Sequence, residues 1–285
     1  MEKYEHISKK IMHSLCIFCV NAIPALYAIT CIFPLLWLFY TTFKTQPEFS
    51  IDVLALPKSW ANISNYSYVL TQMPVLQAMF NTLRITAIVI FCVLMFSFIN
   101  GYFLARFKFK GSKVLSVLYM SNLLIPIHAI LVPVYIIFVK LGLSNRWYST
   151  ILPCICMELT TSIFLVRSYV DTIPRELEEA ASIDGSSFTR TLLSIILPLI
   201  KPVVVTCGII SFFHVWNEFP FSLILFSNEK DYTLPLMLMR FKGEYFTDYP
   251  RVMTSLFVSI VPALIIYSLF SKQIIKGMMA GAIKG

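Results

Sequence analysis

The stretch Glu179–Pro198, EAASIDGSSFTRTLLSIILP, lies between two long apolar segments and decides how the rest of the chain is interpreted. It carries acidic, basic and hydroxyl side chains, whereas the segments on either side are mostly apolar. A polar connection between two membrane spans lies outside the hydrocarbon layer, because irregular backbone is not tolerated in lipid. Its surface therefore faces water, lipid headgroups or another protein.

The overall composition indicates a membrane protein. The chain has 285 residues, of which 58% are hydrophobic and 13% are charged, and its mean hydropathy is +0.76. A soluble domain has about 25% charged residues, so too few charged groups are present to cover a soluble surface. The sequence predicts an all-α integral membrane protein.

Apolar segments of about 20 residues predict transmembrane helices. Six such segments are expected, at Ser14–Tyr40, Ala78–Leu104, Val114–Val139, Tyr148–Val166, Pro202–Phe226 and Val252–Phe270. The first is longer than the apolar region of a signal peptide and lacks a small-residue cleavage site, so we expect it to be retained.

Basic residues predict the orientation in the membrane. The loop 105–113 holds Arg106, Lys108, Lys110 and Lys113, and basic residues favour the cytoplasmic side. Both termini and the loops 105–113 and 167–201 are therefore predicted to be cytoplasmic, and 41–77, 140–147 and 227–251 to lie outside. The last of these also carries basic residues, which reduces the contrast. The net charge of +8 is explained by topology, and we expect no nucleic-acid partner.

No catalytic or metal-binding motif stands out. The histidines do not accompany a recognisable nucleophile motif, and Cys16-x-x-Cys19 lacks a second pair of ligands. No Gly-rich phosphate loop of the Walker type occurs, so we expect no ATP, metal or other cofactor in this chain. We expect a non-enzyme, although an intramembrane hydrolase stays an alternative because catalytic triads form in space.

The residues around Glu179 predict a helix, a turn and a second helix. Asp171–Pro174 is typical of a helix start, and Glu176, Glu178 and Glu179 suit the positive end of a helix dipole. Gly185 favours a turn with positive φ, and a second short helix is expected over about Ser187–Ile196.

The alternative is an amphipathic helix lying on the lipid surface. Such helices are basic on their polar face, whereas the first predicted helix is rich in acids and only Arg175 adjoins it before the turn. Anionic lipid would repel this segment, so a protein partner is the better interpretation.

At these residues the chain resembles a known family. The spacing EAA-x-x-x-G-x9-I-x-LP, complete from Glu179 to Pro198, is similar to the signature of inner-membrane permease subunits of ATP-binding-cassette (ABC) importers. The resemblance implies a type I importer fold with a cytoplasmic coupling helix that docks on an ATPase. The implied coupling residues are Glu179, Ala180, Ala181, Asp184, Gly185, Leu197 and Pro198.

Other stretches resemble the shorter permease subunit of maltose-type sugar importers. They are WNEFPFSLILF (Trp216–Phe226), YTLPL (Tyr232–Leu236) and IIKGMMAGAIKG (Ile274–Gly285). The resemblance implies a longer permease partner in a heterodimer, an ATPase dimer that binds ATP and Mg²⁺, and an extracellular solute-binding protein. It also implies that the C-terminal tail contacts the ATPase through Lys276, Gly277, Gly281 and Lys284.

This reading divides the chain into 1–77, a five-helix permease core over 78–271, and a cytoplasmic tail over 272–285. Candidate residues of the transport path are polar groups within or near spans, namely Glu158, Asn217 and Glu218. An ionisable group in a span is a functional candidate, and a structural hydrogen bond between helices is the alternative for Glu158. Asn217 and Glu218 favour a gate or a helix break, because Pro220 follows.

The loop Ser227–Arg251 is a candidate surface for the binding protein, and a solvated loop with buried aromatic residues explains it equally well. A mono- or oligosaccharide is the expected cargo. An importer of another solute and a secondary transporter remain alternatives, although the latter typically shows internal repeats, and none is evident here.

Overall fold

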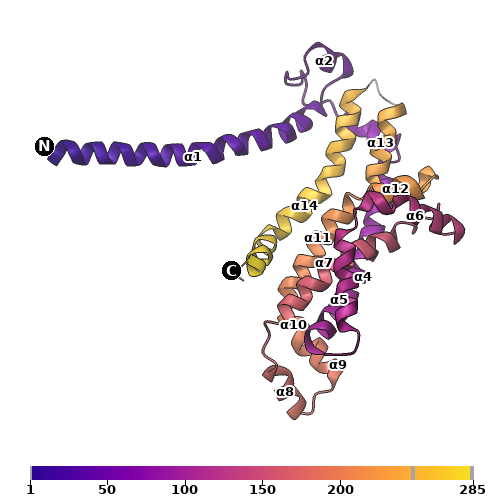
Figure 1. Ribbon diagram of the computed structural model, residues 1–285. Helices are drawn as coiled ribbons and strands as arrows, with labels where there is room; N and C mark the ends of the chain where they lie inside the picture. Colours follow the sequence, from indigo (N-terminus) through magenta and orange to yellow (C-terminus); the bar gives the residue numbers. More distant parts are fainter. Residues whose placement is uncertain (1, 245–247, 283–285) are drawn as a thin grey trace. The chain divides into compact units, whose positions relative to one another are not determined.

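A computed structural model describes residues 2–244 and 248–282, with side chains for 20–239 and 248–273. Those residues form helices and turns and contain no strand, so the predicted all-α class is confirmed. The helices (Figure 1) are α1 Glu2–Thr41, α2 Gln46–Ile51, α3 Ser64–Thr71, α4 Val75–Arg106, α5 Ser112–Leu124, α6 Ile127–Lys140, α7 Ile151–Val170, α8 Glu176–Ile183, α9 Phe188–Thr191, a π-helical turn Leu192–Ile196, α10 Leu197–Leu199, α11 Lys201–Trp216, α12 Pro220–Leu225, a 3₁₀ turn Glu229–Asp231, α13 Leu234–Glu244 and α14 Tyr249–Ala282.

Within the described residues, four helical segments are long and apolar enough to cross a membrane. They are Val20–Thr41, Val75–Arg106, Ile151–Val170 and Tyr249–Gln273. Two bent helix pairs, α5 with α6 and α9–α10 with α11, pass the same test as pairs. The predicted count of six is reached when each bent pair counts as one span.

The third expected span, Val114–Val139, is present as a bent helix pair and not as one straight helix. Helices α5 and α6 meet at 106°, and the break lies at Ile125, which has extended backbone (φ −84°, ψ 115°) before Pro126. A residue before proline is driven out of the helical region because the proline ring clashes with it. The fifth span differs too: α11 ends at Trp216, short of the expected Phe226, and α10 joins α11 at 72°.

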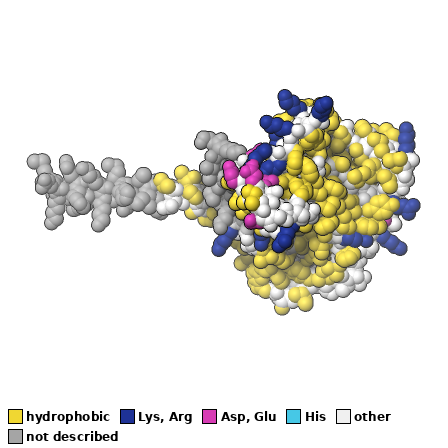
Figure 2. All heavy atoms as spheres, turned by 90° about the horizontal axis from the view of Figure 1, so that it is seen from below, with side chains coloured by type: hydrophobic (Ala, Val, Ile, Leu, Met, Phe, Trp, Pro, Cys, Tyr) yellow, Lys and Arg dark blue, Asp and Glu magenta, His cyan; other side chains and the backbone are white. Residues whose placement is uncertain are grey.

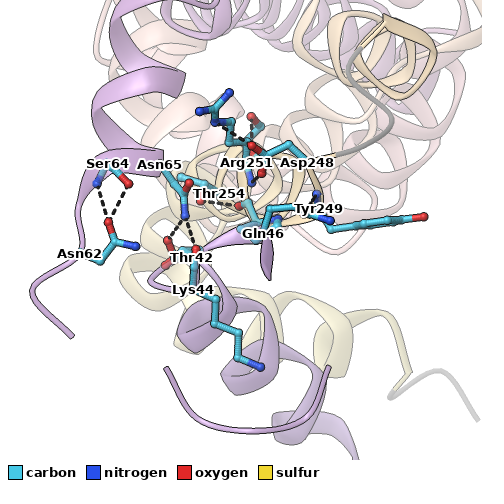
Figure 3. A network of polar contacts seen from close by, with 12 residues as sticks. Thr42, Lys44, Gln46, Asn62, Ser64, Asn65, Asp248, Tyr249, Arg251 and Thr254 are labelled. Atoms are coloured by element: carbon cyan, nitrogen blue, oxygen red, sulfur yellow. Dashed lines mark hydrogen bonds and ion pairs between the residues drawn. The ribbon is translucent and has the colours of Figure 1, made fainter. Parts of the chain in front are cut away.

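One compact unit comprises the residues up to Gln72 and the start of α14, up to Val258. Polar contacts hold its loops together (Figure 3): the Asn65 side-chain amide donates to the carbonyls of Thr42 and Lys44, each at 2.8 Å. The buried Lys44 ammonium donates to the carbonyls of Asp52 and Val53 at 3.1 and 2.9 Å. Burial lowers the pKa of Lys44, since it removes water from around the ammonium group. The two carbonyl oxygens take the place of that water.

The second unit, Met73 to Glu244 with the rest of α14 from Ser259, contains both candidate functional regions. Its centre is the packing of α4 against α7 and α11, which lie side by side in Figure 1. At Gly101 of α4 the approach is so close that an added Cβ would lie 2.7 Å from Val166 Cγ1 of α7. A buried cluster continues from there toward α8 and the π-helical turn; its members are Phe98, Tyr102, Val166, Val170, Ile173, Ile196, Ile200, Val203 and Cys207.

Candidate functional site

The segment 176–198 folds as a helix, a turn at Gly185 and a second helical segment, much as its residues predict. Helix α8 begins at Glu176, two residues after Pro174, and has Glu176, Glu178 and Glu179 in its first turn. Gly185 has φ +76°, its N–H donates to Ser182 at 3.1 Å, and the Ser186 N–H donates to Ala181 at 2.9 Å. This pair of bonds is a Schellman motif, which requires a residue in the left-handed region and so selects glycine.

The second segment is shorter as an α-helix than expected. The Ser187 hydroxyl accepts from the Arg190 N–H at 3.4 Å and starts α9, but the α-helix gives way to a π-helical turn over Leu192–Ile196. The helix expected over Ser187–Ile196 is present from Phe188 onward, as a short α-helix followed by a π-helical turn. Such π turns are frequent at functional sites.

One glutamate of α8 anchors this loop to the end of α4. The Glu178 carboxylate accepts from the Tyr102 hydroxyl at 2.6 Å and from Arg106 Nε at 2.6 Å. A second guanidinium nitrogen of Arg106 donates to the Ile173 carbonyl at 2.9 Å. The Arg106 side chain is 6% exposed and that of Glu178 is 19% exposed, so the pair is shielded from water and its loss would be costly.

The sequence reasoning missed this anchor. The sequence places Arg106 among the basic residues that predict topology, and Glu178 among the acids at a helix start. The available signal was the spacing of Tyr102 and Arg106, which places both on one face of a helix. That face cannot be matched to a glutamate more than 70 residues away without the tertiary structure.

The predicted coupling residues divide into exposed and packed groups. Glu179, Ala180, Asp184, Gly185 and Pro198 are exposed, whereas Ala181 is buried and Leu197 packs against the core cluster. Two apolar side chains of α8 are also exposed, Leu177 at 43% and Ile183 at 86%. Figure 2 shows a small group of acidic side chains next to apolar ones. The exposed face of α8 thus combines acidic side chains with the small side chain of Ala180 and the apolar side chains of Leu177 and Ile183.

The three candidate path residues lie around one cavity of about 590 Å³ in the second unit. Helices α6, α7, α11 and α12 and the connection between the last two supply its lining. The lining residues are Ile127, Cys154, Met157, Glu158, Phe213, His214, Val215, Asn217, Glu218, Pro220 and Phe221. The structure therefore brings Glu158, Asn217 and Glu218 together, although Glu158 is about 60 residues distant along the chain from the other two.

The polar groups of the cavity have distinct partners. Glu158 contacts His214 Nδ1 at 3.0 and 3.2 Å through its two oxygens. Glu218 accepts from the N–H of Ser222 at 3.2 Å and from its hydroxyl at 2.7 Å, and also from the Phe221 N–H. The carboxylate thereby accepts hydrogen bonds from N–H groups at the start of α12 that have no partner within the helix. The helix is interrupted over 217–219, between α11 and α12, as Pro220 predicts.

His214 is the cavity residue that sequence reasoning missed. It lies three residues before Asn217 in the last turn of α11, and its side chain is 63% exposed. The i, i+3 spacing to Asn217 was the available signal. Among the residues whose side chains are described, no group of three His, Cys, Asp or Glu could hold a metal ion.

The structure describes only some of the C-terminal candidate residues. Lys276, Gly277 and Gly281 lie in the last turns of α14, where only the backbone is described. Lys284 lies outside the described residues. Their contact with an ATPase stays a prediction, as does the division at 77 and 271.

Comparison with known proteins now decides the family. Residues 97–278 match the family model described as "Binding-protein-dependent transport system inner membrane component". The chain belongs to this family. The matched range begins within α4 and includes the anchored α8 loop and the whole cavity, so both candidate regions belong to the family's shared part.

Individual relatives agree with this inner membrane component family. The chain is 38% identical to a "Putative ABC transporter permease protein ORF2" of Caldicellulosiruptor sp. (strain Rt8B.4), over 88% of this chain and 91% of that one. It is 30% identical to the "Trehalose/maltose transport system permease protein MalG" of Thermococcus litoralis, over 91% and 94%. It is also 30% identical to the "Sulfoquinovosyl glycerol transport system permease protein SmoH" of Agrobacterium fabrum, over 89% of each chain.

The fold of this inner membrane component is also similar to a solved structure. A "bacterial ABC transporter involved in the import of the acidic polysaccharide alginate" superposes with a TM-score of 0.77, at 21% identity, over 89% of this chain and 95% of that one. The expected ABC importer permease fold is confirmed, and the chain is a multi-pass membrane protein of a transport system.

Proposed function

We propose that this protein is one of two permease subunits of an ABC importer for a mono- or oligosaccharide. Its cavity forms part of the transport path, and a second, longer permease supplies the facing wall. Named relatives include several sugar transport permeases. A solute-binding protein delivers cargo from outside, as with the alginate transporter solved with a periplasmic protein.

The proposal rests on the exposed face of α8, a helix that Glu178 anchors to the end of α4. Ile183, which is 86% exposed, and Leu177 lie beside acidic side chains at the end of the unit. An apolar group of this kind is costly in water and suits a groove on a protein partner. The partner is a cytoplasmic ATPase dimer, which binds ATP and Mg²⁺, and both termini of this chain lie on the same side.

The anchor explains how the ATPase moves the permease. When the ATPase dimer closes, it displaces α8, and Glu178 transfers that displacement to Arg106 and Tyr102 at the end of α4. Because α4 packs tightly on α7 at Gly101, the helices shift as a body and the path opens to the other side. The C-terminal residues Lys276, Gly277, Gly281 and Lys284 add a second contact with the ATPase.

The test uses the complete importer and a matched pair of glycine variants. Gly185 and Gly142 both have positive φ (+76° and +67°), and an added Cβ at either would meet nothing within 4 Å. We expect Gly185→Asp to abolish co-purification with the ATPase and cargo-stimulated ATP hydrolysis, whereas Gly142→Asp should preserve both. Transport that continues in the absence of any ATPase would refute the proposal in favour of a secondary transporter.

An importer of a non-sugar solute is the second candidate. A thermal-shift panel of sugars and amino acids on the cognate binding protein separates the two. A response to amino acids alone would overturn the carbohydrate assignment and leave the importer class intact.

A further inference from the structure

The cavity between α6, α7, α11 and α12 offers few open hydrogen-bonding groups. Glu218 is committed to the start of α12, and the Asn217 side-chain N–H donates to the Phe213 carbonyl at 2.8 Å. Glu158 is committed to His214 Nδ1. Within the described part of the chain, and apart from the buried Cys154 thiol, the side-chain nitrogen and oxygen atoms of the lining without a hydrogen bond are His214 Nε2 and the Asn217 side-chain oxygen.

Glu158 gives the exposed imidazole a defined orientation. Its carboxylate, 11% exposed, holds Nδ1, and the ring of His214 is 63% exposed. When a carboxylate accepts from Nδ1–H, Nε2 is left to accept or, in the imidazolium, to donate a hydrogen bond. A hydroxyl can make either bond, so a polyhydroxylated ligand matches this position in both protonation states.

Next to the imidazole the wall supplies an apolar surface. Phe213 is half-buried and lines the same cavity, as does Met157. A few placed polar groups on a mostly apolar wall are typical of small-molecule sites. The ring of Phe213 with His214 Nε2 and the Asn217 oxygen therefore fits the apolar face and the hydroxyl edge of a sugar.

The charges that this chain contributes to the lining disfavour anionic sugars. The lining contains two carboxylates, Glu158 and Glu218, and one imidazole, but no Lys or Arg. Recognition of a carboxylate or sulfonate group relies on Arg or Lys with charge-assisted hydrogen bonds, and two nearby carboxylates oppose an anion. The structurally similar alginate transporter and the relative named for sulfoquinovosyl glycerol handle anionic cargo, so a preference for uncharged saccharides would distinguish this chain from both.

We propose that this cavity binds an uncharged saccharide, with His214, oriented by Glu158, as a cargo-contacting residue. The inference rests on the proposed function and narrows its cargo. Asn217 contributes its side-chain oxygen to the same ligand.

The experiment measures ATP hydrolysis by the complete importer in nanodiscs, with its binding protein, against two panels. The uncharged panel holds malto-, arabino- and galacto-oligosaccharides; the anionic panel holds oligogalacturonate, oligoalginate and sulfoquinovosyl glycerol. We expect a member of the uncharged panel to stimulate hydrolysis and no member of the anionic panel to do so. His214→Gln should lower that stimulation at least tenfold, whereas His128→Gln, an exposed histidine of α6 outside the cavity lining, should leave it within twofold.

A charge-changing variant makes the test independent of folding losses. His214→Arg should lower stimulation by the uncharged sugar and let at least one anionic saccharide, inactive with the wild type, stimulate hydrolysis, because a gain of response cannot come from lost folding. Stimulation of the wild type by anionic saccharides alone, or equal responses of the His214 and His128 variants, would overturn the inference while leaving the proposed function standing. Stimulation by amino acids and by neither sugar panel would instead contradict the carbohydrate importer itself.

Discussion

Two carboxylates in the second unit have similar shielding but very different partners. The Glu178 side chain is 19% exposed and binds Arg106, which is 6% exposed; the Glu158 side chain is 11% exposed and binds His214, which is 63% exposed. Arginine keeps its charge at all relevant pH values and bonds through several nitrogens at once, whereas an exposed imidazole can exchange its partner or proton. The Arg106–Glu178 pair, called the joint below, holds α8 to α4 in a fixed position. The Glu158–His214 pair instead presents an exposed side chain to a ligand.

The largest expected effect tests the fixed joint directly. Arg106→Ala leaves a partly buried carboxylate without its cation, so we expect the free energy of unfolding to fall by about 3–5 kcal/mol. Unfolding by SDS in mixed micelles, followed by circular dichroism, measures it. Lys108→Ala, at an exposed position two residues later, is the control and should change little; equal losses in the two variants would mean that the pair is no joint.

A second variant tests whether the joint has a rigid support. Gly101→Ala would place its Cβ 2.7 Å from Val166 Cγ1 and 3.0 Å from the Ile163 carbonyl oxygen, and overpacking of this kind costs about 1–3 kcal/mol. Gly208→Ala is the control, because its Cβ would lie 3.6 Å from the nearest side chain. The same unfolding assay applies, and a Gly101→Ala variant as stable as Gly208→Ala would show that α4 and α7 separate easily.

A smaller and more local effect is expected at the turn beyond the joint. Gly185→Ala forces a left-handed conformation on a residue with a Cβ, at about 1–2 kcal/mol, but meets no neighbour. Because Glu178 still holds α8, the loss should appear as faster amide hydrogen exchange over 181–187 alone. Faster exchange that extends to Tyr102 and Arg106 would show that the turn and the joint are one cooperative element.

The smallest effect on stability is expected at the second carboxylate. Glu158→Gln changes a hydrogen-bonded contact whose partner, His214, is largely exposed, so we expect a loss of about 0.5 kcal/mol. Glu178→Gln, measured in parallel, should cost several times more, because Arg106 is buried. If the two substitutions cost the same, the contrast between joint and ligand surface would not hold.

The local parts of this protein could be predicted from sequence. The acids in the first turn of α8, the glycine at its end and the break before Pro220 all follow from nearest neighbours along the chain, and each is present. The apolar segments follow in the same way, since the length of an apolar run sets what can span a bilayer. The bend at Ile125 was missed, although Pro126 gave a signal for it.

What the sequence alone determined is the class of protein, the helical segments, and the family signature from Glu179 to Pro198. Only the tertiary structure decided that Glu178 turns inward while its neighbour Glu179 faces outward, and that Glu158 meets His214. The physical reason is that composition and turn chemistry are properties of consecutive residues, whereas the partner of a charged group depends on which helices pack together. Here α4 and α7 bring Arg106 to Glu178 across 72 residues, a contact that no spacing along the chain encodes.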